Sequence, residues 1–250
     1  AGLATAPARL TGRIAIGGQD HFYLEGQIAM AIPGEGGDML VLSSTQHPSE
    51  VQHMVARVLG LPDAAVTVQC RRMGGGFGGK ESQANLPACV AALVAAVTGR
   101  PAKCRMDRDD DMIVTGKRHD FLVDYDVGFA ADGRIRAVDM VLASRCGWSA
   151  DLSGPINDRA LFHADNGYFY PAVGLVAFPC RTNTVSNTAF RGFGGPQGMV
   201  AAERVIEEIA FATGLDPLDV RKRNLYGPAP RDVTPYHMAI DDNVLPELIG

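Results

Sequence analysis

The sequence predicts an α+β fold with mixed sheets and packed helices, because two kinds of apolar spacing occur along its 250 residues. Short apolar runs between turn residues are typical of strands, as at residues 28–32 and 39–42. Elsewhere apolar residues recur every three or four positions, as along one side of a helix, at residues 51–59 and 199–209. No solenoid period is visible, which leaves the α+β interpretation.

The first half is expected to begin with strands between Gly12 and Ser44, followed by a helix that Gly60 and Pro62 end. An acidic run, DRDDD at 107–111, suits the first turn of a short helix, where carboxylates face the positive end of the helix dipole. Between the first helix and this acidic run we expect a strand at 65–70 and a glycine-rich loop at 74–79. A helix at 82–98 and a short strand that begins at Cys104 follow.

The second half is expected to contain a long antiparallel hairpin around the turn Asp132–Gly133. Its strands would be residues 121–129 and 135–144. After the hairpin we expect a loop-rich section up to Pro179 and a second glycine-rich loop at 191–195. A helix with Pro196 in its first turn follows and ends at Gly214, and a last helix covers 216–225. Residues 227–250 would form a proline-rich linker or surface segment.

Composition excludes several classes of protein. The net charge is −5 with both signs interspersed, so the basic footprint of a nucleic-acid-binding protein is missing. No apolar run approaches the roughly 20 residues of a membrane helix. The five cysteines contain no C-x-x-C and read as reduced thiols of a cytosolic protein rather than zinc or iron–sulfur ligands. The start of the chain has no signal-peptide core and no initiating Met, and reads as a truncated or processed end.

The two glycine-rich loops each precede a helix, where free N–H groups can cradle an anion. For one loop, a tight turn without a ligand is an equally good explanation of the glycines. Two loops of the same build, each with a central Phe, favour one shared ligand with anionic oxygens, and we expect them to lie close together and face one cavity. A nucleotide is disfavoured, because a phosphate-binding loop needs Ser or Thr where Glu81 stands, and no acidic residue follows at the dinucleotide-binding spacing.

Several long motifs resemble the xanthine dehydrogenase family of molybdenum hydroxylases, in its molybdenum-binding subunit. They are GGQDHFYLEGQ at 17–27, STQHPSE at 44–50, RRMGGGFGGKES at 71–82, DRALFHADN at 158–166 and SNTAFRGFGGPQG at 186–198. Three others resemble its bacterial form: RDDDM at 108–112, TGKRHDF at 115–121 and CGWSADLSG at 146–154. The resemblance is collinear over residues 12–226.

The resemblance implies that residues 1–226 are part of a domain that binds the molybdenum cofactor, Mo-molybdopterin. It implies hydroxylation of hypoxanthine and xanthine, with electrons passing to FeS clusters and FAD in partner domains and on to NAD. The family's general-base glutamate lies in a motif that this chain lacks, so we expect no catalytic residue here and no activity of the chain by itself. A companion part of the molybdenum subunit is an implied partner.

The resemblance also assigns cofactor-facing residues. Gln46 corresponds to the glutamine beside the apical oxo group, where an amide can donate a hydrogen bond without adding charge; its plainer interpretation is a helix cap near Ser49. Gly76, Phe77 and Gly78 correspond to a loop whose backbone approaches the cofactor, and Arg191 and Gly192 to a second such loop. Gln46, Phe77 and Arg191 would lie near the metal without bonding to it.

Three further residues correspond to the family's substrate contacts. Glu81 would orient the purine edge, or else be an acid at a helix start. Arg159 would bond a purine oxygen, or else form a surface ion pair. Phe193 would be an aromatic wall of the purine pocket, or else a core Phe. Two alternatives remain: a non-catalytic cofactor-binding piece of a split subunit, and a hydroxylase of aldehydes or other N-heterocycles.

Overall fold

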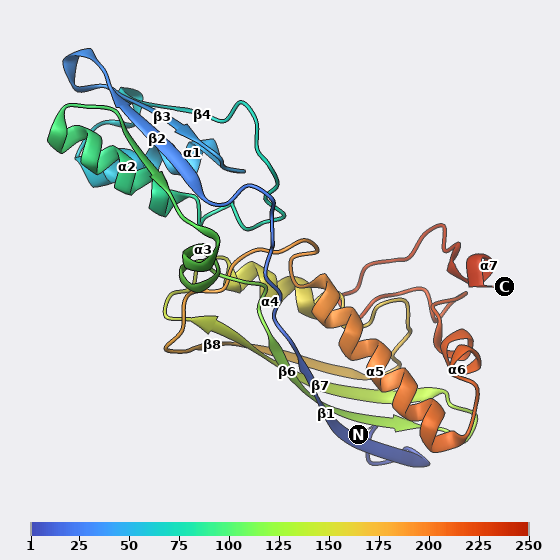
Figure 1. The fold of residues 1–250 in the computed structure, drawn as a ribbon. Helices are drawn as coiled ribbons and strands as arrows, with labels where there is room; N and C mark the ends of the chain where they lie inside the picture. Colours follow the sequence, from blue (N-terminus) through green and yellow to red (C-terminus); the bar gives the residue numbers. More distant parts are fainter. Residues whose placement is uncertain (1, 250) are drawn as a thin grey trace.

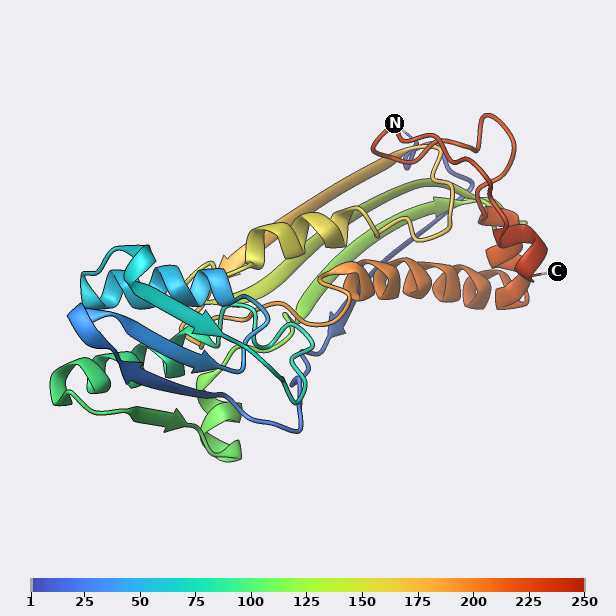
Figure 2. The same cartoon turned by 90° about the horizontal axis from the view of Figure 1, so that it is seen from above.

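The computed structural model describes residues 2–249 and arranges them as two sheet-and-helix units that meet end to end (Figure 1). The chain leaves the larger unit after its first strand, builds the smaller unit, and returns to complete the larger one. Seen from above, each sheet is covered by helices of its own unit, and the two units meet through connecting segments (Figure 2). The junction is therefore made of loops, which is where both glycine-rich segments lie.

The smaller unit is a four-stranded sheet of order β4-β3-β2-β5. The strands are β2 (Ile28–Pro33), β3 (Met39–Ser43), β4 (Val66–Gln69) and β5 (Ala102–Arg105), and only the β3–β4 pair is parallel. Alternate residues of β2 and β3 point inward, as the two-residue period of a strand requires. Helices α1 (Pro48–Leu59) and α2 (Asn85–Thr98) pack on that face through an alanine- and valine-rich core.

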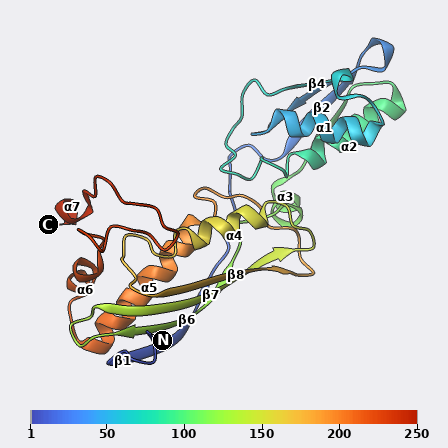
Figure 3. The ribbon, with the colours of Figure 1, turned by 180° about the vertical axis from the view of Figure 1, so that it is seen from behind.

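The larger unit is a sheet of order β1-β6-β7-β8, formed by β1 (Ala8–Ile16), β6 (Phe121–Phe129), β7 (Ile135–Gly147) and β8 (Val173–Arg181). The β1–β6 and β6–β7 pairs are antiparallel, and β7–β8 is parallel. Helices α4 (Ser153–Leu161) and α5 (Gly195–Thr213) lie along one face (Figure 3). The apolar side of α5 completes the main core against β6 and β7.

Short elements join and flank the units. Helix α3 (Arg108–Val114) lies at the junction, and the Asp107 carboxylate caps it by accepting from the Asp110 N–H at 2.8 Å. Helix α6 (Pro217–Asn224) packs against α5, helix α7 (Leu245–Ile249) lies near the C-terminal end, and the short 3₁₀ turns are η1 (Glu35–Gly37) and η2 (Asp63–Ala65). In the part of the chain that is described, no helix is long and apolar enough to cross a membrane.

The predicted α+β class is confirmed, and so are the hairpin and the helices after each glycine-rich loop. The expected loop-rich section up to Pro179 was wrong, because it contains α4 and most of β8. β8 pairs in parallel with a strand distant in sequence and leaves its later residues exposed, so it has no clear alternation. Helix α2 begins at Asn85 rather than near Ser82, β5 begins before Cys104, and α7 was not expected.

Candidate functional site

The two glycine-rich loops form the same four-residue turn, at residues 76–79 and 192–195. In the first turn the Gly79 N–H donates to the Gly76 carbonyl at 2.7 Å, and in the second the Gly195 N–H donates to the Gly192 carbonyl at 3.0 Å. The central pairs, Phe77–Gly78 and Phe193–Gly194, have positive φ at both positions: 54° and 99°, then 51° and 95°. This is the pattern of a type I′ turn. A left-handed Phe costs roughly 1–2 kcal/mol, and strain of this kind collects at functional sites.

The two turns are bonded to each other. The Arg191 N–H donates to the Phe77 carbonyl at 2.9 Å, and a Cβ added to Gly78 would lie 2.7 Å from the Ala189 carbonyl. Only glycine at position 78 permits this backbone approach. The prediction that the loops lie close together is confirmed, while their shared cavity stays a prediction.

Gln46 lies against the first turn with its amide in a fixed orientation. Its Oε1 accepts from the N–H groups of Gly78 at 2.8 Å and Lys80 at 3.2 Å. Because two N–H donors require an acceptor, they identify this atom as the oxygen. The exposed Nε2 is therefore left to donate outward. The helix-cap interpretation is wrong, since the N-cap residue of α1 is His47 and α1 has no side-chain capping hydrogen bond.

Lys80 supports the first loop from beneath and does not face a ligand. Its side chain is fully buried, and its ammonium donates to the Glu25 carbonyl at 2.7 Å, Ser44 Oγ at 2.8 Å and Glu25 Oε2 at 3.2 Å. The same Glu25 oxygen accepts from the Gly74 N–H at 2.9 Å. Burial lowers the pKa of Lys80, and the Glu25 carboxylate opposes that shift. A lysine held in this way cannot bind a nucleotide phosphate.

Two residues that the sequence analysis did not single out support the second loop. The buried His21 lies behind both loops, with Nε2 2.6 Å from the Ala189 carbonyl, which identifies Nε2 as the protonated nitrogen. Burial lowers the pKa of His21, which favours its neutral form. Arg118 donates from Nη2 to the Arg191 carbonyl at 2.7 Å, and its Cζ lies 4.0 Å from the centre of the Phe190 ring. Both residues lie inside quoted motifs, the only signal that could have identified them.

Glu81 directly follows the first turn and is partly exposed. Burial raises its pKa, with smaller contributions from the carboxylates of Asp151 and Glu50 and an opposing one from His47. The interpretation of Glu81 as a helix-start acid is wrong, because α2 begins four residues later and has no acid in its first turn.

Arg159 is exposed on the last turn of α4 and forms no ion pair with any other residue between 2 and 249. The interpretation as a surface ion pair is thus wrong for the described part. Its helix is pressed against the second loop, because a Cβ on Gly194 would overlap the Ile156 carbonyl oxygen. Phe193 is half-buried beside this contact. That Glu81 and Arg159 share one pocket stays a prediction.

A family model described as "Molybdopterin cofactor-binding domain" matches residues 1–225. The chain belongs to this family. Over 246 residues it is 45% identical to xanthine dehydrogenase/oxidase of Mus musculus, covering 98% of this chain and 18% of that protein. It is 49% identical to the Gallus gallus xanthine dehydrogenase/oxidase over 218 residues, 87% of this chain and 16% of that protein. The chain therefore spans less than a fifth of these relatives.

Solved structures of other enzymes share the fold of this molybdopterin-binding domain. Aldehyde oxidoreductase from Desulfovibrio gigas matches with a TM-score of 0.89 and 27% identity, over 99% of this chain and 27% of that one. Quinoline 2-oxidoreductase from Pseudomonas putida 86 matches with a TM-score of 0.82 and 23% identity, over 99% and 32%. The resemblance to the molybdenum-binding part of xanthine dehydrogenase is confirmed by the sequence relatives and the family match.

The junction fits the cofactor of this family in its hydrogen-bond donors. Gln46 offers an outward amide donor, and a Cβ on Gly76 would lie 2.6 Å from Gln46 Oε1, so glycine at position 76 lets the Gln46 side chain lie directly against the loop. Behind the second loop, Arg118 Nη1 is buried with no hydrogen-bond partner in the described chain. Hydrogen-bond donors of this kind suit a cofactor rich in oxo and phosphate oxygens. The roles of Gln46, Phe77 and Arg191 near the metal remain predictions.

Proposed function

We propose that this domain belongs to a molybdenum hydroxylase that oxidises xanthine and hypoxanthine, and that its two paired turns form the wall nearest the metal. The observation that carries the proposal is the fixed amide of Gln46, whose oxygen is held by Gly78 and Lys80 so that only its N–H group faces outward. Such a donor meets an oxo group of the metal without adding charge.

When bound, the molybdenum cofactor supplies the redox chemistry of hydroxylation. The residues of this chain place the reactants. The hydrogen bond from the Arg191 N–H to the Phe77 carbonyl holds the two turns at a fixed separation, and the glycines at 76 and 78 let Gln46 and the backbone of Ala189 approach closely. Donors that are already in place do not have to rearrange during the reaction, and this lowers the free energy of the transition state.

The purine is the substrate that Glu81 and Arg159 suit best. A purine has donors and acceptors around its rim, while the carbon that reacts has none, so orientation must come from the far edge. Burial raises the pKa of Glu81, and its carboxyl group can accept hydrogen bonds from donors on the purine rim. The Arg159 guanidinium, which forms no ion pair within residues 2–249, suits an oxygen on which negative charge develops. Phe193 would stack on the ring.

The partners follow from the length of the relatives. The general-base glutamate, the rest of the molybdenum subunit and the FeS and FAD domains would be supplied by sequence outside this chain, as they would be for a cytoplasmic enzyme of purine catabolism. Residues 1–226 would form part of the molybdopterin-binding domain, and 227–250 a linker or surface segment. This chain alone would form no urate from xanthine.

A hydroxylase of aldehydes is the second candidate, because a solved aldehyde oxidoreductase shares the fold at a TM-score of 0.89. The test is turnover of xanthine and of benzaldehyde by the complete enzyme that contains this chain. We expect a much higher kcat/KM for xanthine. A preference for benzaldehyde would overturn the purine assignment and leave the cofactor-binding role in place.

A further inference from the structure

Three segments distant in sequence meet at the side chain of Asp151. Its Oδ2 accepts from Ser82 Oγ at 2.6 Å and Gln83 Nε2 at 3.0 Å. Its Oδ1 accepts from Thr188 Oγ1 at 2.7 Å and from the Leu152 N–H at 2.7 Å. A carboxylate only accepts hydrogen bonds, so it suits four donors converging on its two oxygens.

Each of these donors lies beside a residue that the proposed function uses. The first two directly follow Glu81. The Leu152 N–H immediately precedes α4, the helix that carries Arg159. Thr188 is fully buried and lies three residues before Arg191 at the start of the second loop. One carboxylate thus fixes the separation of the segments that read the substrate and approach the cofactor.

The backbone at Asp151 is strained to hold this position. Its φ is 42°, in the left-handed region that Asp and Asn tolerate better than other residues with a side chain. Strain of this kind persists only where the surrounding contacts impose it. Ser82 Oγ and Thr188 Oγ1, which each donate their one hydrogen to Asp151, lie 3.1 Å apart, so the two loop segments also meet directly beside the carboxylate.

We propose that Asp151 is a positioning residue for purine recognition. It holds the segments of Glu81, Arg159 and Arg191 in the one arrangement in which the two charged side chains can read opposite sides of the purine rim. This role rests on the proposed function. The Asp151 charge has a second effect, since it adds to burial and Glu50 in raising the pKa of Glu81 against the opposing His47.

Asp151→Asn in the complete cofactor-loaded enzyme tests the role with little change to the backbone, because Asn also tolerates positive φ. It keeps the Oδ1 acceptor and replaces Oδ2 by a donor that faces Ser82 and Gln83. We expect kcat/KM for xanthine to fall on the order of 10-fold, since small misplacements of orienting groups are costly. For benzaldehyde, which does not need the rim contacts, the change should stay within about 2-fold.

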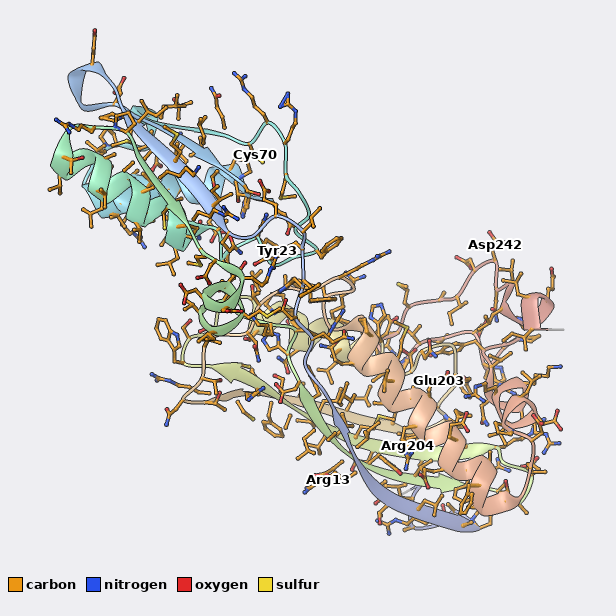
Figure 4. All side chains as sticks on the ribbon, viewed as in Figure 1. Arg13, Tyr23, Cys70, Glu203, Arg204 and Asp242 are labelled. Carbon is orange, nitrogen blue, oxygen red and sulfur yellow. The ribbon has the colours of Figure 1, made fainter. Side chains whose placement is uncertain are left out.

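A pH profile separates this role from a merely structural one. Removing the Asp151 charge lowers the pKa of Glu81, so the limb of the xanthine profile that Glu81 controls should move to lower pH. Glu203→Gln is the matched control: Glu203 also accepts several hydrogen bonds, from Asn166, Tyr168 and Arg221, but it lies along α5 away from the junction at Tyr23 (Figure 4). This control should lower stability without changing the xanthine-to-benzaldehyde ratio or the limb.

Amide hydrogen exchange gives a readout independent of turnover. In Asp151→Asn, exchange should rise in peptides covering residues 82–85, 149–153 and 186–190 together, and it should not rise there in the control. If xanthine is a substrate of the wild-type enzyme but the substrate ratio and the exchange are unchanged in Asp151→Asn, the positioning role is refuted and the proposed function stands. A wild-type enzyme that leaves xanthine untouched refutes the proposed function, and the purine role of Asp151 with it.

Discussion

The two glycine-rich loops adopt one turn but are supported by different interactions. Behind the first loop lie charged groups, the buried Lys80 ammonium and the Glu25 carboxylate. Behind the second loop lie the backbone of α4, which excludes any side chain at Gly194, and the stacked pair of Arg118 and Phe190. The shared turn is encoded locally by Phe–Gly pairs, whereas the supports come from residues far away in sequence. The first loop should therefore respond to loss of charge, and the second to steric change.

Gly194→Ala should have the largest effect. The added Cβ would overlap the Ile156 carbonyl oxygen, and φ is 95°. We expect a loss of at least about 3 kcal/mol in the free energy of unfolding, because neither backbone can yield cheaply. Gly214→Ala is the control, with φ of 68° and open space around it; it should cost roughly 1–2 kcal/mol. Urea unfolding of both variants checks this, and equal losses would contradict the steric account.

Lowering the pH should destabilise the region of the second loop, because His119 becomes protonated. This fully buried residue has its Nε2 2.7 Å from Ser153 Oγ at the start of α4, and its carbonyl accepts from Gln197 on α5 at 3.1 Å. Burial lowers the pKa of His119 to about 4. The unfolded chain, with an ordinary pKa near 6.5, then binds more protons than the folded one between these values. Stability is complete above about pH 6.5 and falls as pH approaches 4.

The size of this loss should be on the order of 1–3 kcal/mol over that range. His119→Gln should give a shallower dependence of unfolding free energy on pH, measured by urea unfolding at several pH values. Parallel curves for the two proteins would show that His119 does not carry the effect.

Lys80→Met should weaken the first loop and leave the second intact. It removes three hydrogen bonds and leaves the Glu25 carboxylate without its cation. Because Glu25 is partly exposed to water, we expect a loss of about 2 kcal/mol rather than the full cost of breaking a buried pair. Adding Glu25→Gln should recover part of it in a double-mutant cycle followed by urea unfolding. Strictly additive losses would mean that the pair is not coupled.

The two proposed substrate residues belong to different loops. Glu81 directly follows the first loop, and Arg159 lies on α4, the helix that packs against the second loop. Each charged hydrogen bond is worth roughly 1.5–3 kcal/mol, so Arg159→Met or Glu81→Val should lower kcat/KM for xanthine on the order of 10–100-fold. Glu81→Val should also shift preference toward aromatic aldehydes, which need no rim contact. An unchanged ratio of xanthine to benzaldehyde turnover in the complete enzyme would count against both assignments.

The sequence predicted the elements whose signal is local. The Asp132–Gly133 turn, the alternation of β6 and the glycines that end α1, α2 and α5 each lie within or directly beside the element that they define. It could not predict β8, which is defined by parallel pairing with β7, or α4, whose Gly154 and Pro155 weaken any helical pattern.

The same distinction holds for the site. Gln46, Phe77 and Arg191 were identified through motifs, but the hydrogen bonds that bring them together cross the chain. The supports at His21, Lys80, Arg118 and Asp151 depend on contacts between segments tens of residues apart. No spacing rule along one chain reports such contacts, so the supporting residues emerge only from the fold.

The central claim is that the backbone of the first turn and Lys80 holds the Gln46 amide so that it donates to the cofactor. A crystal structure of the complete enzyme with its molybdenum cofactor tests this most directly. We predict that Gln46 Nε2 lies about 2.7–3.2 Å from an oxygen of the cofactor, with Oε1 still bonded to the Gly78 and Lys80 N–H groups and the turns on either side. A cofactor bound away from these turns, or a Gln46 amide rotated so that its oxygen faces the metal, would contradict the account.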